Sequence, residues 1–73
     1  MQYNSIENGQ RLTELRGNQP RESVAAAVKI SVSTLAMYEL GQRNPRDEVK
    51  CSLANYYGVR VSDIFFPDEV HSK

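Results

Sequence analysis

The 73-residue chain has very few of the residues that cross-link small proteins. It contains one cysteine, Cys51, and no tryptophan. A single cysteine cannot form an internal disulfide, and no cluster of metal-ligand residues accompanies it, so we expect no disulfide, metal or cofactor. This cysteine content fits a reducing compartment. The fold must therefore depend on its own hydrophobic core, which is modest in a chain of this length.

Long apolar runs are also missing. No segment approaches the roughly 18 apolar residues that a membrane helix needs. The N-terminal segment MQYNSIENGQ is polar and acidic, unlike a secretory signal. We therefore expect a cytoplasmic protein that does not contact membranes. Its length predicts one domain over residues 1–73, with a core over about residues 6–66 and a tail over residues 67–73.

The chain has no net charge, because nine basic residues balance nine acidic ones. A strong positive charge is the usual mark of a nucleic-acid-binding protein. The charges are unevenly distributed, however. Residues 16–46 carry five basic and two acidic side chains, a net charge of +3. Residues 1–15 carry one basic and two acidic side chains, a net charge of −1, and residues 47–73 carry three basic and five acidic side chains, a net charge of −2. Positive charge thus collects in the middle third, although chance can produce such an imbalance in a short chain.

Apolar spacing and residues that begin or end helices predict an all-α fold of five short helices. Proline or serine stands at most of the expected starts and glycine at most of the expected ends. In the fourth helix, Val49, Leu53 and Tyr57 recur at intervals of four and form one apolar face. We expect Ser62 to cap the fifth helix. The five helical segments are ENGQRLTELRG, QPRESVAAAVK, SVSTLAMYELG, PRDEVKCSLANYYG and SDIFF.

The second and third segments have the spacing of a helix-turn-helix, in which two helices meet at roughly 90–120°. Ala25 is small, so two helices can cross closely there. Ile30 fills the angle between them, and Leu35 and Tyr38 anchor the second of the two helices to the core. Ser31 is a good N-cap for that helix.

These segments resemble the Cro/phage-repressor (XRE-type) helix-turn-helix DNA-binding family. The matching pieces, in family order and spacing, are GQRLTELR, the stretch from RESVAAAVKIS to GQRNP, and LANYYGVRVSDIFF. The resemblance implies a compact five-helix domain whose third helix lies in the DNA major groove. It further implies a sequence-specific, double-stranded DNA-binding transcription regulator of repressor type, acting as a homodimer on a near-palindromic operator. No small-molecule substrate is implied.

The resemblance also implies roles for single residues. The expected base contacts are Ser31, Val32, Ser33 and Met37. The expected contacts with the DNA backbone are Arg21, Thr34, Arg43, Asn44 and Arg46. Arg21 stands where the family usually has a glutamine that binds a phosphate, and Arg16 and Glu39 match a buried ion pair between the first and third helices. The expected dimer interface comprises Tyr56, Phe65 and Phe66, with the alternative that the two phenylalanines only cap the core.

The sequence departs from the family pattern at several positions. Lys29 occupies a turn position that usually carries glycine, where a positive φ would cost lysine about 1 kcal/mol. Lys50 stands at a usually apolar position, so its charged end must reach solvent. The groove-facing set lacks the arginine, glutamine and asparagine side chains that make bidentate base contacts. Base recognition would therefore depend on Ser33 hydrogen bonds, on contacts of Val32 and Met37 with thymine methyl groups, and on DNA shape.

Two other interpretations stay open at this point. The zero net charge and the apolar outer side of the third helix would also suit a protein-interaction module on the same fold, of antirepressor or antitoxin type. Cys51 and His71 are the candidates for a nucleophile and a base, but the third, orienting group of such a site is missing, so we expect no enzyme. Phage or plasmid immunity repressors, restriction–modification controllers and chromosomal regulators all fit the DNA-binding interpretation.

Overall fold

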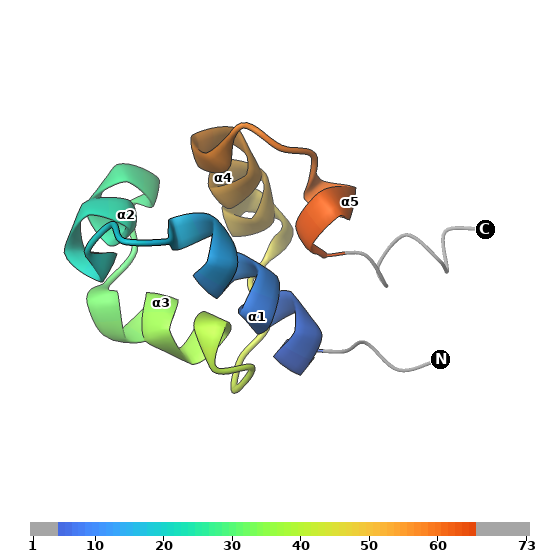
Figure 1. Ribbon diagram of the computed structural model, residues 1–73, viewed down its shortest axis with the longest axis horizontal. Coiled ribbons are helices and arrows are strands. Elements are labelled where there is room, and N and C mark those ends of the chain that lie inside the picture. Colours follow the sequence, from blue (N-terminus) through green and yellow to red (C-terminus); the bar gives the residue numbers. More distant parts are fainter. Residues whose placement is uncertain (1–4, 66–73) are drawn as a thin grey trace.

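A computed structural model describes residues 5–65, which form helices and, within that range, no strand. The predicted all-α architecture with five helices is confirmed (Figure 1). A helix-turn-helix is formed by the second and third of them, as expected. The helices are α1 (Ser5–Arg16), α2 (Arg21–Val28), α3 (Val32–Glu39), α4 (Asp47–Tyr57) and α5 (Val61–Ile64).

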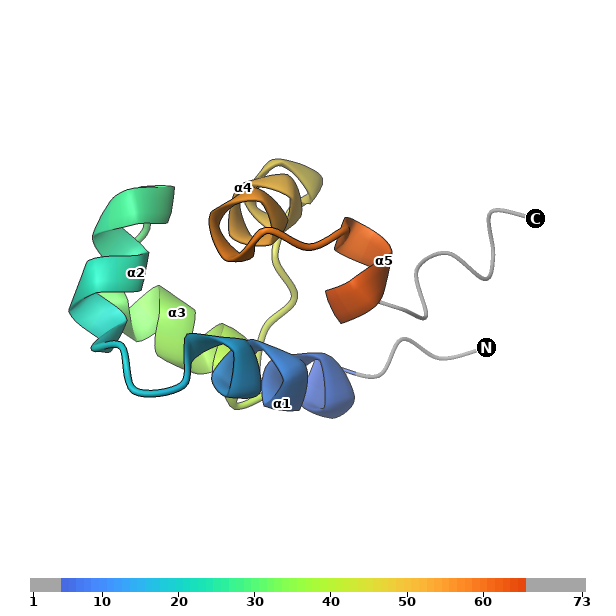
Figure 2. The same ribbon diagram turned by 45° about the horizontal axis from the view of Figure 1, so that its top comes forward.

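The helices pack around one core. Helix α1 packs against α3 and α5, and α2 packs against α3 and α4. Helix α2 lies at the opposite end of the molecule from α5 (Figure 2). All five helices contribute buried apolar side chains, so α3 is held from several sides. The core residues are Leu12, Val24, Ala25, Val28, Leu35, Tyr38, Leu53, Ala54, Ile64 and Phe65.

The close approach of α1 to α3 depends on Gly9. A Cβ atom at this position would lie 2.3 Å from the carbonyl oxygen of Glu39 and 2.7 Å from that of Tyr38, far inside contact distance. Gly9 therefore lets the backbone of α1 rest directly on the last turn of α3. A glycine inside a helix weakens it by about 1 kcal/mol relative to alanine, and here the close packing of two helices offsets that weakness.

The helix starts differ in part from those expected. Helix α4 begins at Asp47 with Arg46 as its N-cap, two residues after the expected Pro45. The expected Ser62 cap of α5 is wrong, because the N-cap residue is Arg60. The backbone N–H of Arg60 donates a hydrogen bond to Asp63 Oδ2 at 2.9 Å, so an aspartate within the first turn reaches back to the N-cap residue.

Phe65 occupies the core, which corrects its expected place in a dimer interface. Its side chain is 0% exposed within the single subunit, so it cannot reach a second copy without opening the fold. Lys50 is buried rather than extended into solvent as expected, and its Nζ lies 5.4 Å from the centroid of this ring and 4.0 Å from Asp47 Oδ1. Tyr56 remains at the surface, and its hydroxyl donates a hydrogen bond to the side chain of Gln19. Phe66, the other expected interface residue, lies outside the described residues, as do His71 and the expected tail.

Candidate nucleic-acid interface

The turn between α2 and α3 is closed by backbone hydrogen bonds. The N–H of Lys29 donates to Ala26 O at 3.3 Å, and the N–H of Ile30 donates to Ala25 O at 3.0 Å. This pattern ends α2 in a left-handed residue, and Lys29 has φ 62° and ψ 47°. Lysine therefore occupies a conformation that favours glycine, at a cost of roughly 1 kcal/mol. The turn nevertheless holds the angle at which α3 leaves α2.

Ser31 begins α3 through its hydroxyl group. The oxygen accepts a hydrogen bond from the Thr34 backbone N–H at 3.0 Å, and the hydroxyl donates to Thr34 Oγ1 at 2.8 Å. Ser33 Oγ lies 3.4 Å from Ser31 Oγ. The Ser31 hydroxyl is therefore engaged in the helix cap, which leaves Ser33 as the better placed of the two serines for an external hydrogen bond.

The two sides of α3 differ sharply in exposure. Leu35 and Tyr38 are buried in the core on the inner side. On the outer side, Val32 is 39% exposed, Ser33 is exposed and Met37 is half-buried. The side chains expected to face a DNA groove thus lie toward solvent to different degrees, with Met37 the least accessible. Their contact with bases stays a prediction.

A buried carboxylate joins three helices at the end of α3. The Glu39 side chain is 1% exposed. Arg16 Nε lies 2.8 Å from Glu39 Oε2, and Arg16 Nη2 lies 3.1 Å from Oε1. Arg21 Nε also donates to Oε1, at 2.8 Å, a bond that the sequence did not predict. The hydrogen bonds that Arg16 donates to the Glu39 carboxylate raise the pKa of the Arg16 guanidinium above its ordinary value. One carboxylate between two guanidinium groups leaves this cluster with a net positive charge.

Tyr57 lies in the same electrostatic environment. Burial raises the pKa of its hydroxyl to about 12, and the negative charge of Glu39 adds to the shift. Its hydroxyl is buried and bonds to no other residue of the described chain. The side chain packs beside the core, as expected, so the neutral phenol is the form that the fold favours.

The loop between α3 and α4 carries exposed polar and basic side chains close to α3 in the sequence. Arg43, Asn44 and Arg46 are exposed. Asn44 Oδ1 accepts a hydrogen bond from the hydroxyl of Ser5, which ties the loop to the start of α1. Within residues 5–65, neither Arg43 nor Arg46 forms an ion pair, so their charges are available to an external anion.

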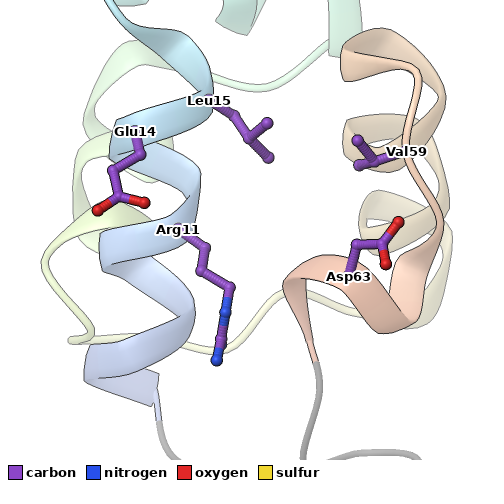
Figure 3. Close-up of a pocket in the computed structure, with 5 residues that line it drawn as sticks. All are labelled: Arg11, Glu14, Leu15, Val59 and Asp63. Atoms are coloured by element: carbon purple, nitrogen blue, oxygen red, sulfur yellow. The ribbon is translucent and has the colours of Figure 1, made fainter.

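A groove of about 360 Å³ lies elsewhere, between α1 and the segment that joins α4 to α5. Leu15 and Val59 point toward one another across it, and Arg11, Glu14 and Asp63 complete its lining (Figure 3). None of its lining residues belongs to α3 or to the loop after it, so the groove is separate from the candidate interface.

Three features bear on other kinds of site. Over residues 5–65, no group of three or more histidine, cysteine, aspartate or glutamate side chains is arranged to hold a metal ion. Over the same range, none of the helices has the length and apolarity to cross a bilayer. Cys51 is exposed and has a free thiol.

Comparison with known proteins decides the family. The sequence model of the helix-turn-helix family HTH_3 matches residues 12–64. The chain belongs to this family, the Cro/phage-repressor (XRE-type) helix-turn-helix proteins. It is therefore a DNA-binding regulator of transcription, with double-stranded DNA as its partner.

A solved structure of a controller protein has the same fold. The restriction-modification controller protein C.AhdI from Aeromonas hydrophila is similar to this chain, with a TM-score of 0.76 and 29% sequence identity. The match covers 82% of this chain and 94% of that protein. No curated protein matches the chain.

Proposed function

We propose that this helix-turn-helix protein is a homodimeric transcriptional repressor that reads a near-palindromic operator through α3. The exposed outer side of α3 carries the proposal, because Val32 and Ser33 are accessible on a helix whose opposite side is fixed in the core. In the proposed complex, α3 of each subunit enters one major groove. The two grooves lie one helical turn apart, about 34–36 Å, which is why the operator should repeat with two-fold symmetry.

Phosphate contacts are proposed for the cations and polar groups around α3. Arg43 and Arg46 carry charges that no other described residue neutralises, and Asn44 is exposed beside them. Arg21, which bonds Glu39 at the last turn of α3, and Thr34, in the first turn of α3, complete the proposed set. Phosphate contacts fix the orientation of a protein on DNA but do not read its sequence.

Base recognition is proposed for the outer side of α3. Ser33 can donate or accept a hydrogen bond at a base edge. Val32 and Met37 offer apolar contact to thymine methyl groups. Ser31 can add a contact only if its hydroxyl serves a base while it caps the helix. With so few donors, sequence-dependent DNA shape must contribute to selectivity.

The biological role proposed here is that of a restriction–modification controller. It is supported by the similarity to C.AhdI, which extends over 94% of that protein. The dimer is proposed to involve Tyr56, which is exposed on α4. A single small helix-turn-helix domain offers little contact area to DNA, so two copies bind more tightly than one.

Selection from a pool of randomised duplex DNA at about 0.1 M salt, followed by sizing of the complex, tests this proposal. We expect a near-palindromic site with half-sites about 10–10.5 base pairs apart and two chains per duplex. With about three or four phosphate contacts per subunit, log K should fall with log salt at a slope of about −5 to −7.

A matched pair of arginine variants gives the control. Arg43→Ala should weaken binding to every duplex, whereas Arg60→Ala should not, because Arg60 lies at the start of α5, away from α3. A slope near zero and no enriched sequence would refute the proposal. A stable complex with another protein under those conditions would instead support an interaction module on this fold.

A further inference from the structure

We infer that Glu39 is a positioning residue for DNA binding, which holds the Arg21 guanidinium so that its outer N–H groups meet a DNA phosphate at the start of α2. The inference rests on the proposed DNA-binding mode of α3. It adds to that mode a second role for the Glu39 carboxylate. The same group that links α1 to α3 also positions a side chain that contacts the DNA backbone.

The two arginines that share Glu39 are placed differently. Arg16 bonds both carboxylate oxygens and also donates from Nη1 to Gln19 O at 2.9 Å, and its side chain is 16% exposed. Arg21 uses only Nε, and its side chain is 38% exposed. Arg16 is thus the inner partner that holds the helices together, and Arg21 is the outer partner that reaches solvent.

The shape of the guanidinium explains how Glu39 can aim Arg21. The group is planar and carries its N–H donors in a rigid fork. When Nε–H is bonded to the fixed Glu39 oxygen, the plane of the fork is set and the N–H groups on the two Nη atoms remain. Those groups bond no other residue among the described ones. Because a side chain that is already ordered loses less conformational entropy on binding, the held fork binds an anion better than a mobile one.

The position of Arg21 on α2 favours a phosphate as that anion. Arg21 is the first residue of α2, and the N-cap is Pro20, whose side chain offers no capping hydrogen bond. The Ser23 N–H donates to Pro20 O at 3.1 Å, which leaves the first-turn N–H groups of Arg21 and Glu22 without a side-chain acceptor, and such groups attract phosphate. The guanidinium and the first free N–H of α2 belong to the same residue, so both are donors that an anion at the start of α2 can use. Arginine and phosphate also match in bidentate geometry.

A salt-dependence series on the selected duplex tests the inference. The readout is the slope of log K against log salt, which becomes less negative by about 0.9 for each phosphate that the protein no longer neutralises. We expect Arg21→Ala and Glu39→Gln each to change the slope by this amount, and the double variant to change it no further. If Glu39 only contributed negative charge near the DNA, Glu39→Gln would have the opposite effect and would tighten binding.

Arg21→Lys covers the case in which Glu39→Gln fails to fold. This variant keeps the charge and leaves the Arg16–Glu39 pair intact, but a lysine ammonium cannot hold Glu39 and a phosphate through a rigid fork. We expect it to lose the same part of the slope as Arg21→Ala. Wild-type affinity and slope in Arg21→Lys would overturn the inference.

Arg43→Ala is the matched control, because Arg43 does not contact Glu39. Its effect on the slope should add to that of Glu39→Gln, whereas the effect of Arg21→Ala should not. Additive effects for both arginines would overturn the positioning role while leaving DNA binding established. If the wild-type chain itself shows no salt-dependent binding to a selected duplex, the proposed function fails instead.

Discussion

The inner and outer sides of α3 use their side chains in opposite ways. The inner side buries Leu35, Tyr38 and Glu39, which pack in the core or bond arginines from other helices. The outer side leaves Val32 and Ser33 accessible. Substitutions on the inner side should therefore reduce the stability of the fold, and substitutions on the outer side should change binding with little effect on stability.

The difference follows from the shortness of α3. A helix of eight residues is unstable by itself in water, because the cost of nucleation exceeds the gain from its few hydrogen bonds. The Ser31 cap, the apolar inner side and the Glu39 ion pairs supply what the isolated helix lacks. Fixed from within in this way, α3 can present an outer side that contributes little to folding.

The largest effect should come from Leu35→Ala. Leu35 is fully buried, so the substitution leaves a cavity and should lower the free energy of unfolding by about 2–5 kcal/mol. A domain of this size has a small margin of stability, so much of the protein should unfold near physiological temperature. Urea denaturation measures the change. A loss below about 0.5 kcal/mol, the range of ordinary surface substitutions, would contradict the assignment of Leu35 to the inner side.

Ser33→Ala should act on binding instead. Loss of one hydrogen bond to a base edge should reduce discrimination at a single base-pair position by about 0.5–1.5 kcal/mol, with the unfolding midpoint nearly unchanged. Competition among operators that differ by one base pair measures this effect. Equal weakening on all of these operators would show that Ser33 contacts the backbone rather than a base.

Lys29→Gly should raise stability without changing the contacts of either side of α3. Glycine adopts the observed φ of 62° without strain, so the free energy of unfolding should rise by up to about 1 kcal/mol, less the extra entropy of glycine in the unfolded chain. Thermal unfolding measures the gain. A matched Lys29→Ala variant should show none, and a gain from alanine equal to that from glycine would exclude backbone strain as the cause.

The smallest expected effect concerns Tyr57 and pH. Its pKa is about 12 in the fold and about 10 in unfolded chains. The fold therefore binds this proton more tightly, and the resulting stability is complete below pH 10 and is lost as pH rises from about 10 to 12. Urea denaturation at both ends of this range should show a larger loss for wild type than for Tyr57→Phe. Equal losses would place the tyrosine hydroxyl in solvent.

Much of the fold could be predicted because its signals are local. Glycine stops, the Ser31 cap and the spacing of Leu35 and Tyr38 depend on residues near one another in the chain. The close packing at Gly9 could not be predicted without a homologous structure, since a glycine inside a helix indicates weakness, and its partners lie about thirty residues away on α3. The burial of Phe65 likewise depends on how the end of α5 packs on the core.

The residues of the candidate site could be predicted from the sequence, but the hydrogen bonds between them could be predicted only in part. The resemblance to the family pointed to Arg16 and Glu39, which the structure places 2.8 Å apart. The bond from Arg21 to the same carboxylate does not follow from the resemblance, which implies only a phosphate contact at this usual glutamine position. The charge of Arg21 offered a signal, since an arginine near a buried carboxylate tends to pair with it.

An NMR titration of isotope-labelled protein with its selected duplex, in which backbone amide chemical shifts are measured, tests the central claim most directly. The account predicts the largest shift changes at residues 31–37 and at Arg43, Asn44 and Arg46, with Leu15 and Val59 in the separate groove unchanged. Changes concentrated at Leu15 and Val59, with the amides of residues 31–37 unmoved, would contradict it.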